Sequence, residues 1–406
     1  MGRNRQRVYQ RQGVILRLCR HLIMIIDTVL LEIKWLEIDE KHLTRFTTKN
    51  KSDSRWQVVF NGNKEANGYY PYITITKIMG LNGWHIDRIE IQFSAPMIIW
   101  GTNYYGIDET EKMRLFEILF EKLKWIFNGQ PIITKGHLYT ADLRVIAISF
   151  NFILPDLIGY PIEFLRVIPL LDMGKRFRKS KTTSYDQDTF GFCVRLFNLQ
   201  SSLKIYDKGA QTINTATTPE EKEVVVLMKR GVLPSKVCRI ELTFQNRTSL
   251  KKRLATKFNS PIKERNLYEV FDNKLCKNIL LEAFDELFDP LNVQALDFPL
   301  FSPQESYQIA KEAGLSQYDA WALIGRSAIA TQGGSLQLKL VSDKYYDRRD
   351  RFKNDKRLKK ILEANPLPSF RLKKFVEECR KQLVEFKVMK PEHFIKNDLA
   401  NFNKVV

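Results

Sequence analysis

The sequence predicts an α+β protein: a mixed or antiparallel β-sheet domain with packed helices, followed by a mostly helical C-terminal domain. Two observations predict this class. Segments rich in β-branched residues, with apolar and polar residues in alternation, occur up to about residue 247, and segments with helical spacing dominate after it. Strands first and helices afterwards are typical of α+β proteins. The expected division is a basic extension over 1–23, a sheet domain over 24–247 and a basic helical domain over 248–406.

The expected elements follow from periodicity and from turn residues. Strands are expected at 24–36, 55–62, 69–77, 88–94, 142–154 and 237–244, with a hairpin formed by 190–197 and 202–208. Helices are expected at 109–128, 161–171, 219–230, 249–258, 266–288, 304–314, 316–330, 341–363 and 368–386.

The composition favours a polyanionic partner. The chain has 65 Lys and Arg against 46 Asp and Glu, a formal net charge of +19. A positive field of this size attracts nucleic acid first and acidic membranes second, although a soluble protein can also simply be basic. The five cysteines are scattered and include no C-x-x-C pair, so neither a zinc site nor a disulfide framework is indicated and a reducing cytoplasm fits. No two of the five histidines have metal-ligand spacing, so a metal site would need carboxylates.

The N-terminal region imitates a signal peptide, because basic residues precede the apolar run Leu22–Leu31. Asp27 interrupts that run, no small-residue cleavage site follows, and the run is too short to span a membrane. The alternation over 24–36 favours a strand, and no membrane partner is expected.

A tyrosine between two lysines is the first candidate for chemistry. In the segment LKIYDKGAQ, Lys204, Tyr206 and Lys208 share one face if the strand continues through them. Neighbouring cations lower a phenol pKa and hold a phosphate near it, which suits a nucleophile. The ordinary alternative is a strand that ends in a turn, since Y-D-K-G is also a turn sequence.

Acidic residues on other expected strands could hold a metal ion. Glu241 alternates with apolar neighbours in VCRIELTF, as Glu90 does in RIEIQF, and Asp142 opens a further strand. Carboxylates that meet on one sheet face could bind Mg²⁺ or Mn²⁺. Each acid alone is equally typical of a solvated or salt-bridged strand residue.

Basic segments are candidates for DNA binding. Phe177 and Tyr185 are interleaved with a cationic loop, a mixture that suits single-stranded DNA but also a solvated loop. The loop cations are Lys175, Arg176, Arg178, Lys179 and Lys181. Two cationic helices, 344–360 and 371–387, could contact duplex DNA, and 312–326 has a helix-turn-helix rhythm.

The order of these segments resembles the gene II replication proteins of filamentous phages. Residues 89–106 are similar to that family's E-x-x-A-S-P-A-K-x-x-x-G-x-N-x-x-G signature. The opening strand at 24–33, a strand with Tyr206 and Lys208, and the later Arg239-Ile240-Glu241 follow in the family's order. The resemblance covers roughly residues 24–290.

The resemblance implies a rolling-circle replication initiator of a phage or plasmid that nicks one origin strand and forms a 5′-phosphotyrosine. Tyr206 takes the position of the nicking tyrosine and Lys208 that of the adjacent lysine. Glu90 and Glu241 take the positions of the metal-binding acids, with Mg²⁺ or Mn²⁺ as cofactor, and Lys204 and Arg239 are expected to contact DNA. The implied partners are single-stranded and duplex origin DNA, a host helicase and a host polymerase. No Walker motif is present, so no nucleotide cofactor is expected.

The sequence departs from the family at three points. The middle strand reads Arg144-Val145-Ile146 where relatives carry R-[IV]-D, so Asp142 is the nearest substitute for the missing acid. Met97 stands in place of the signature's lysine, and the H-x-H motif of the wider nuclease class is absent. Three rivals stay open: a relaxase or transposase with the same tyrosine chemistry, a catalytically decayed origin-binding protein, and a basic peripheral membrane protein.

Overall fold

The computed structural model describes the core of the chain and parts of its C-terminal region. The described residues are 26–34, 36–62, 68–81, 83–154, 165, 168, 183–186, 193–197, 201–245, 266–288, 303–312, 314–322, 324–325 and 371–385. The expected extension 1–23, the helices expected at 249–258 and 341–363, and nearly all of the helix expected at 161–171 lie outside them.

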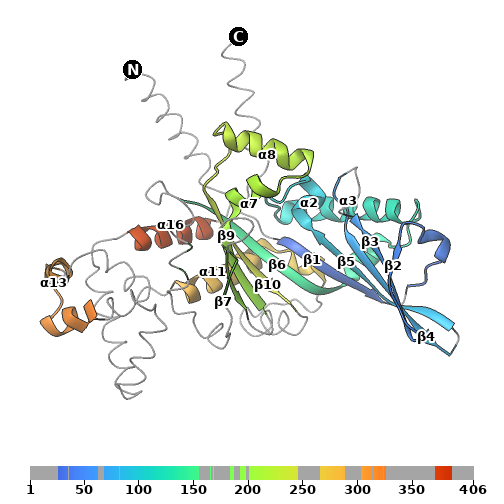
Figure 1. The fold of residues 1–406 in the computed structure, drawn as a ribbon, viewed down its shortest axis with the longest axis horizontal. Coiled ribbons are helices and arrows are strands. Elements are labelled where there is room, and N and C mark those ends of the chain that lie inside the picture. Colours follow the sequence, from blue (N-terminus) through green and yellow to red (C-terminus); the bar gives the residue numbers. More distant parts are fainter. Residues whose placement is uncertain are drawn as a thin grey trace, which may run out of the picture.

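A ten-stranded sheet forms the centre of the molecule (Figure 1). Its strand order is β2-β3-β4-β5-β1-β6-β10-β9-β8-β7, and every pairing is antiparallel. The strands are β1 (Ile26–Lys34), β2 (Thr47–Lys51), β3 (Arg55–Asn61), β4 (Tyr72–Gly80), β5 (Gly83–Ser94), β6 (Asp142–Ile153), β7 (Thr183–Asp186), β8 (Cys193–Phe197), β9 (Ser201–Asp207) and β10 (Val237–Phe244). The expected α+β class with an antiparallel sheet is confirmed.

Helices complete the described fold. They are α2 (Ala95–Trp100), α3 (Lys112–Ile126), α4 (Lys135–Thr140), α7 (Lys208–Thr215), α8 (Pro219–Lys229), α10 (Leu267–Val270), α11 (Asn273–Leu287), α13 (Pro303–Glu312) and α16 (Arg371–Glu385), with 3₁₀ turns η1 (Glu40–His42) and η3 (Glu109–Glu111). The helix expected over 266–288 is divided, because Asp272 accepts a hydrogen bond from the Leu275 N–H and caps a new helix. No described helix is long and apolar enough to span a bilayer.

The central strands have one apolar and one polar face. Phe150 and Phe152 of β6 are buried in the main core, together with Ile240 of β10. Asn151 lies between the two phenylalanines and therefore points the other way, and it is paired with Arg239 of β10. The polar face of this part of the sheet is where the candidate site lies.

The main core continues past the expected boundary near residue 247. Side chains of α11 and α16 belong to the same hydrophobic cluster as the sheet, and the rings of Phe152 and Phe284 are 5.7 Å apart. Gln382 of α16 also bonds both backbone groups of Ile153: its amide nitrogen donates to the carbonyl (3.0 Å) and its oxygen accepts from the N–H (3.1 Å). These two helices are therefore structural parts of the sheet's core.

One end of the strands carries a cap of short elements. In Figure 1, α7 and α8 lie together beyond the end of β9. The segment after α2 is anchored beneath α8 by Tyr104, whose hydroxyl donates to the Pro234 carbonyl at 2.6 Å. Gly101 makes the turn out of α2 with φ +69°, a conformation that favours glycine. Asn103 is thereby held over the ends of β9 and β10.

Several elements differ from expectation. Strand β2 was not expected, because all five of its residues are exposed and none has an apolar side chain. Helices α2, α4 and α7 were also not expected. Strand β9 ends at Asp207, whose side chain accepts from the Ala210 N–H and begins α7, so Lys208 is a helical residue rather than a strand residue.

We expect the Gln382→Leu variant to lower the free energy of unfolding by roughly 2–5 kcal/mol, because it leaves the N–H and C=O of Ile153 buried without partners. Urea unfolding of the full chain measures it. The matched control is Gln308→Leu on α13, where the side chain is exposed and a change within about 0.5 kcal/mol is expected. Equal effects of the two variants would contradict a shared core of α16 and the sheet.

Candidate functional site

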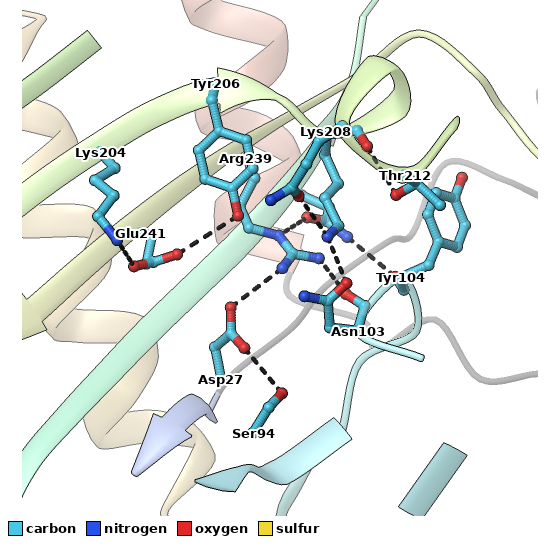
Figure 2. A network of polar contacts seen from close by, with 12 residues as sticks. Asp27, Ser94, Asn103, Tyr104, Lys204, Tyr206, Lys208, Thr212, Arg239 and Glu241 are labelled. Carbon is cyan, nitrogen blue, oxygen red and sulfur yellow. Dashed lines mark hydrogen bonds and ion pairs between the residues drawn. The ribbon is translucent and has the colours of Figure 1, made fainter. Parts of the chain in front are cut away.

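Tyr206 lies at the end of β9, in a row of residues that crosses four strands. It is paired with Arg239 of β10 and with Cys193 of β8, and Arg239 is paired in turn with Asn151 of β6. The side chain is partly buried, and its hydroxyl points toward the carboxylate of Glu241 at 3.5 Å (Figure 2). The phenol therefore has a proton acceptor beside it.

Arg239 is the centre of the site and is 0% exposed. Its Nε donates to Asn151 Oδ1 at 2.7 Å, one terminal nitrogen donates to Asp27 Oδ2 at 3.2 Å, and the other donates to the Asn103 carbonyl at 2.6 Å. These contacts join β10 to β6, β1 and the segment after α2 (Figure 2). Because a guanidinium has five N–H donors, two remain beyond these three bonds, and Arg239 lies opposite Tyr206 in the pairing of β10 with β9.

Glu241 is the second carboxylate of the site, 7% exposed. Lys204 forms an ion pair with its Oε1 at 2.8 Å, and the hydroxyl of Thr243 lies 3.4 Å from the same oxygen. Oε2 is the oxygen that faces Tyr206. The carboxylate is thus fixed between a cation and the phenol.

Lys208 contributes a buried amine from the first turn of α7. It is 1% exposed, and its Nζ donates to Asn103 Oδ1 at 2.6 Å and to Gln211 Oε1 at 2.8 Å. Gly209 allows this placement, because a Cβ there would come within 1.7 Å of the Ser235 carbonyl oxygen. Both acceptors of Lys208 are neutral, so the ammonium has no direct anionic partner among these bonds.

Burial dominates the protonation of the site. It raises the pKa of Tyr206 well above its ordinary value; Glu241 and Asp27 add to the rise, and the Arg239 guanidinium opposes it. Burial likewise raises the pKa of Asp27, against the effect of Arg239. The pKa of Lys208 is well below its usual range because of burial and the nearby Arg239, with Asp27 and Glu241 opposing. The resting phenol is therefore protonated at neutral pH.

The acids expected beside Tyr206 are only partly found there. Glu241 is present, but Glu90 and Asp142 are not. Three strands separate Glu90 on β5 from Tyr206 on β9, which is about 19 Å across the sheet. Asp142 lies nine residues along β6 from Asn151, the level of Tyr206, which is about 30 Å. The expectation that Glu90 and Asp142 lie beside the tyrosine is wrong. Glu90 is too far away because β1, β6 and β10 lie between its strand and β9. Asp142 is too far away because it lies at the opposite end of β6 from Asn151.

Glu90 and Asp142 instead lie on either side of Glu32, which is paired with both. Glu32 is buried, and Arg144 and Lys34 form ion pairs with it at 3.4 and 3.6 Å. Arg88 lies 3.8 Å from Glu90. Cations from the same strands therefore face this row of acids.

The residues at Tyr206 fit a divalent metal ion poorly. Asp27 and Glu241 are the carboxylates of the site, and each already has a cation, Arg239 and Lys204 respectively. On β6, between their strands, the residues that face them are Asn151 and Ser149, which carry no charge. Across the described part of the chain, no three His, Cys, Asp or Glu side chains are grouped to hold a metal.

The residues expected to bind DNA lie in two different parts of the chain. Arg239 and Lys204 lie within the site, one buried and the other about one-third exposed and paired with Glu241. The loop cations Lys175, Arg176, Arg178, Lys179 and Lys181 lie outside the described residues.

Four residues of the site were missed by the sequence reasoning. Asp27 was noted only as an interruption of an apolar run, yet a carboxylate within a buried strand is itself a signal of a buried cation. Its second partner is the Ser94 hydroxyl, at 3.3 Å. Asn103 lies in the segment 89–106 that is similar to the family's signature, but no contact with a cation was expected of it, and Asn151 gave no signal beyond being a polar residue within an apolar strand.

Comparisons with known proteins give little further information. No family model matches the chain, and no curated protein matches its sequence. One similar solved structure is described as "Structure of Rolling Circle Replication Initiator Protein from Geobacillus stearothermophilus". The two chains are 11% identical, the match covers 64% of this chain and 83% of that one, and the TM-score is 0.30. A similarity of this size does not place the chain in a family.

We expect Asp27→Leu to lower the free energy of unfolding by about 3–5 kcal/mol, because it leaves the buried guanidinium of Arg239 without its counter-charge. Urea unfolding measures it. The double variant Asp27→Leu/Arg239→Leu should be more stable than the single one, because it no longer buries an unpaired charge. Additive losses in the two variants would show that the ion pair does not couple these positions.

Proposed function

We propose that this protein is a DNA nicking and joining enzyme that initiates rolling-circle replication of a phage or plasmid, with Tyr206 as nucleophile. One observation supports this above the others: a tyrosine hydroxyl that faces a carboxylate at 3.5 Å, on a residue paired across the sheet with a buried arginine. A base and a cation on one phenol are what nucleophilic attack on phosphorus requires. The order of the sequence motifs supplies the class of substrate.

In the proposed reaction Glu241 acts as the general base. Its Oε2 takes the phenol proton as Tyr206 Oη bonds to the phosphorus. The P–O3′ bond breaks on the opposite side, and the leaving 3′ oxygen takes a proton from water. The products are a 5′-phosphotyrosine and a free 3′ hydroxyl, so the bond energy is conserved in the protein–DNA ester.

The same residues can run the reaction in reverse. A later 3′ hydroxyl attacks the phosphotyrosine, Glu241 returns a proton to the phenolate oxygen, and Arg239 stabilises that oxygen as it leaves. A host polymerase would extend the 3′ hydroxyl and a host helicase would unwind the duplex between the two steps. Relaxases and transposases use the same chemistry, and the fate of the 3′ end distinguishes them.

A second candidate function is origin binding without chemistry. It is favoured by Asn151 and Ser149, the neutral residues of β6 that are paired with Arg239 and Glu241. In that case Arg239 and Tyr206 would serve the fold and a DNA contact only.

We expect Tyr206→Phe to abolish the covalent protein–DNA product while folding and DNA binding stay near wild type, because the ring remains and only the attacking oxygen is lost. The assay uses randomised single-stranded DNA labelled at its 3′ end, which stays on the fragment that joins the tyrosine, and a denaturing gel. The control is Tyr268→Phe on α10, an exposed ring that should leave the product unchanged. A labelled band that persists in Tyr206→Phe would assign the nucleophile elsewhere.

We expect Glu241→Gln to slow formation of the covalent product by about 10²–10⁴-fold, the usual contribution of a general base. Glu90→Gln is the matched control, since it makes the same change on the same sheet but far from Tyr206, and its rate should equal wild type. Single-turnover rates across a pH series measure both. Equal rates for Glu241→Gln and wild type would remove Glu241 from the reaction.

A further inference from the structure

Lys204 and Arg239 each have a carboxylate partner at the Tyr206 site, whereas the hydrogen bonds of Lys208 go to neutral oxygens. Three cationic side chains converge there, Lys204, Lys208 and Arg239, against two carboxylates. These five groups balance while Lys208 is neutral, the form that burial favours, and carry one positive charge in excess once it is protonated. A bound phosphodiester, which carries one negative charge, would balance the site, whereas a divalent metal ion would raise the excess to three.

Two of the three cationic side chains are the most deeply buried of the site. Arg239 and Lys208 are 0% and 1% exposed, and both bond to Asn103. Two buried cations repel each other, and each has also lost its hydration, which costs further free energy. Such an arrangement is typical of a functional site, where a bound anion can offset both costs. An anion beside Lys208 also favours its charged form.

Asn103 occupies the place between the two cations. Its side-chain oxygen accepts from Lys208 and its carbonyl accepts from Arg239, so it satisfies them with neutral oxygens (Figure 2). Tyr104 anchors the backbone beside it, but the Asn103 side chain itself is partly exposed. Rotation of that side chain would free the Lys208 ammonium for an incoming phosphate oxygen.

The two carboxylates of the site already have partners, which a metal ion would have to replace. Asp27 is occupied by Arg239 and Ser94, and Glu241 by Lys204 and the phenol. A metal that bound both acids would have to displace two ion pairs, one of them fully buried on its cationic side. Lys208 and Arg239 would then repel the ion.

We propose that the Tyr206 site neutralises the attacked phosphate with the side chains of Arg239 and Lys208, with Asn103 as their neutral placeholder, and transfers the strand without a divalent metal ion. This inference rests on the proposed nicking function. The step itself is unchanged: the Oη–P bond forms, the P–O3′ bond breaks, Glu241 takes the phenol proton, and water protonates the 3′ oxygen. The two buried cations stabilise the charge on the non-bridging oxygens.

The test is formation of the covalent product by the full wild-type chain in excess EDTA, compared with Mg²⁺ and with Mn²⁺ at matched ionic strength. The probe is randomised single-stranded DNA labelled at its 3′ end. We expect rates that agree within about twofold, because fixed protein charges carry the stabilisation. Product that forms only with metal would overturn the inference and leave the proposed function intact. Product in neither buffer, on DNA that the protein binds, would overturn the proposed function.

Asn103→Asp gives a second test in which the two kinds of site respond oppositely. An added carboxylate pairs with Lys208 and competes with phosphate, so we expect a higher thermal midpoint and at least a roughly tenfold slower reaction. At a metal site the same carboxylate would strengthen Mn²⁺ binding and speed the reaction with Mn²⁺, which would contradict the inference. Asn103→Ala is the matched control, because it removes the amide without adding charge; a loss as large as that of Asn103→Asp would also contradict it.

Discussion

The structure around Tyr206 depends on one buried guanidinium. Arg239 has no contact with solvent and draws together β1, β6 and the segment after α2, through Asp27, Asn151 and the Asn103 carbonyl. A buried cation is tolerated only where its donors are satisfied, so these acceptors are held in place as firmly as the cation itself. The same guanidinium acts on the phenol of Tyr206. The positions of Asp27, Asn151 and Asn103 are therefore all tied to one buried cation.

The sheet could be predicted to a large extent because its strands alternate. The segments around β1, β3, β4, β5, β6, β8, β9 and β10 were all found in this way. Strand β2 was missed because both of its faces are exposed, so no alternation marks it. Helix α7 was missed because its start depends on the Asp207 side chain, which turns the chain one residue before Lys208. The shared core of α11, α16 and β6 depends on contacts over more than a hundred residues, which local patterns do not carry.

The site itself was half predictable. Alternation correctly put Tyr206, Lys204, Arg239 and Glu241 on polar faces, and antiparallel pairing of their two strands brought them together. It could not give the order in which strands are assembled or the register between distant strands. Glu90 and Asp142 satisfy the same alternation, yet they converge on Glu32 at the far end of β6. In a sheet of ten strands, a shared face says little about proximity.

Burial and the neighbouring charges together set which protonation states the Tyr206 site favours. Burial raises the pKa of the Tyr206 phenol and lowers that of the Lys208 amine, so the resting pocket favours neutral forms of both. A bound phosphate would favour the protonated form of Lys208, because it would place a negative charge beside an amine whose hydrogen bonds go to neutral oxygens. In the proposed reaction the incoming anion would oppose ionisation of Tyr206 further, so the phenol proton would leave as the bond to phosphorus forms, with Glu241 in position to receive it. In the proposed reaction the same burial thus couples deprotonation of the phenol to its attack on phosphorus.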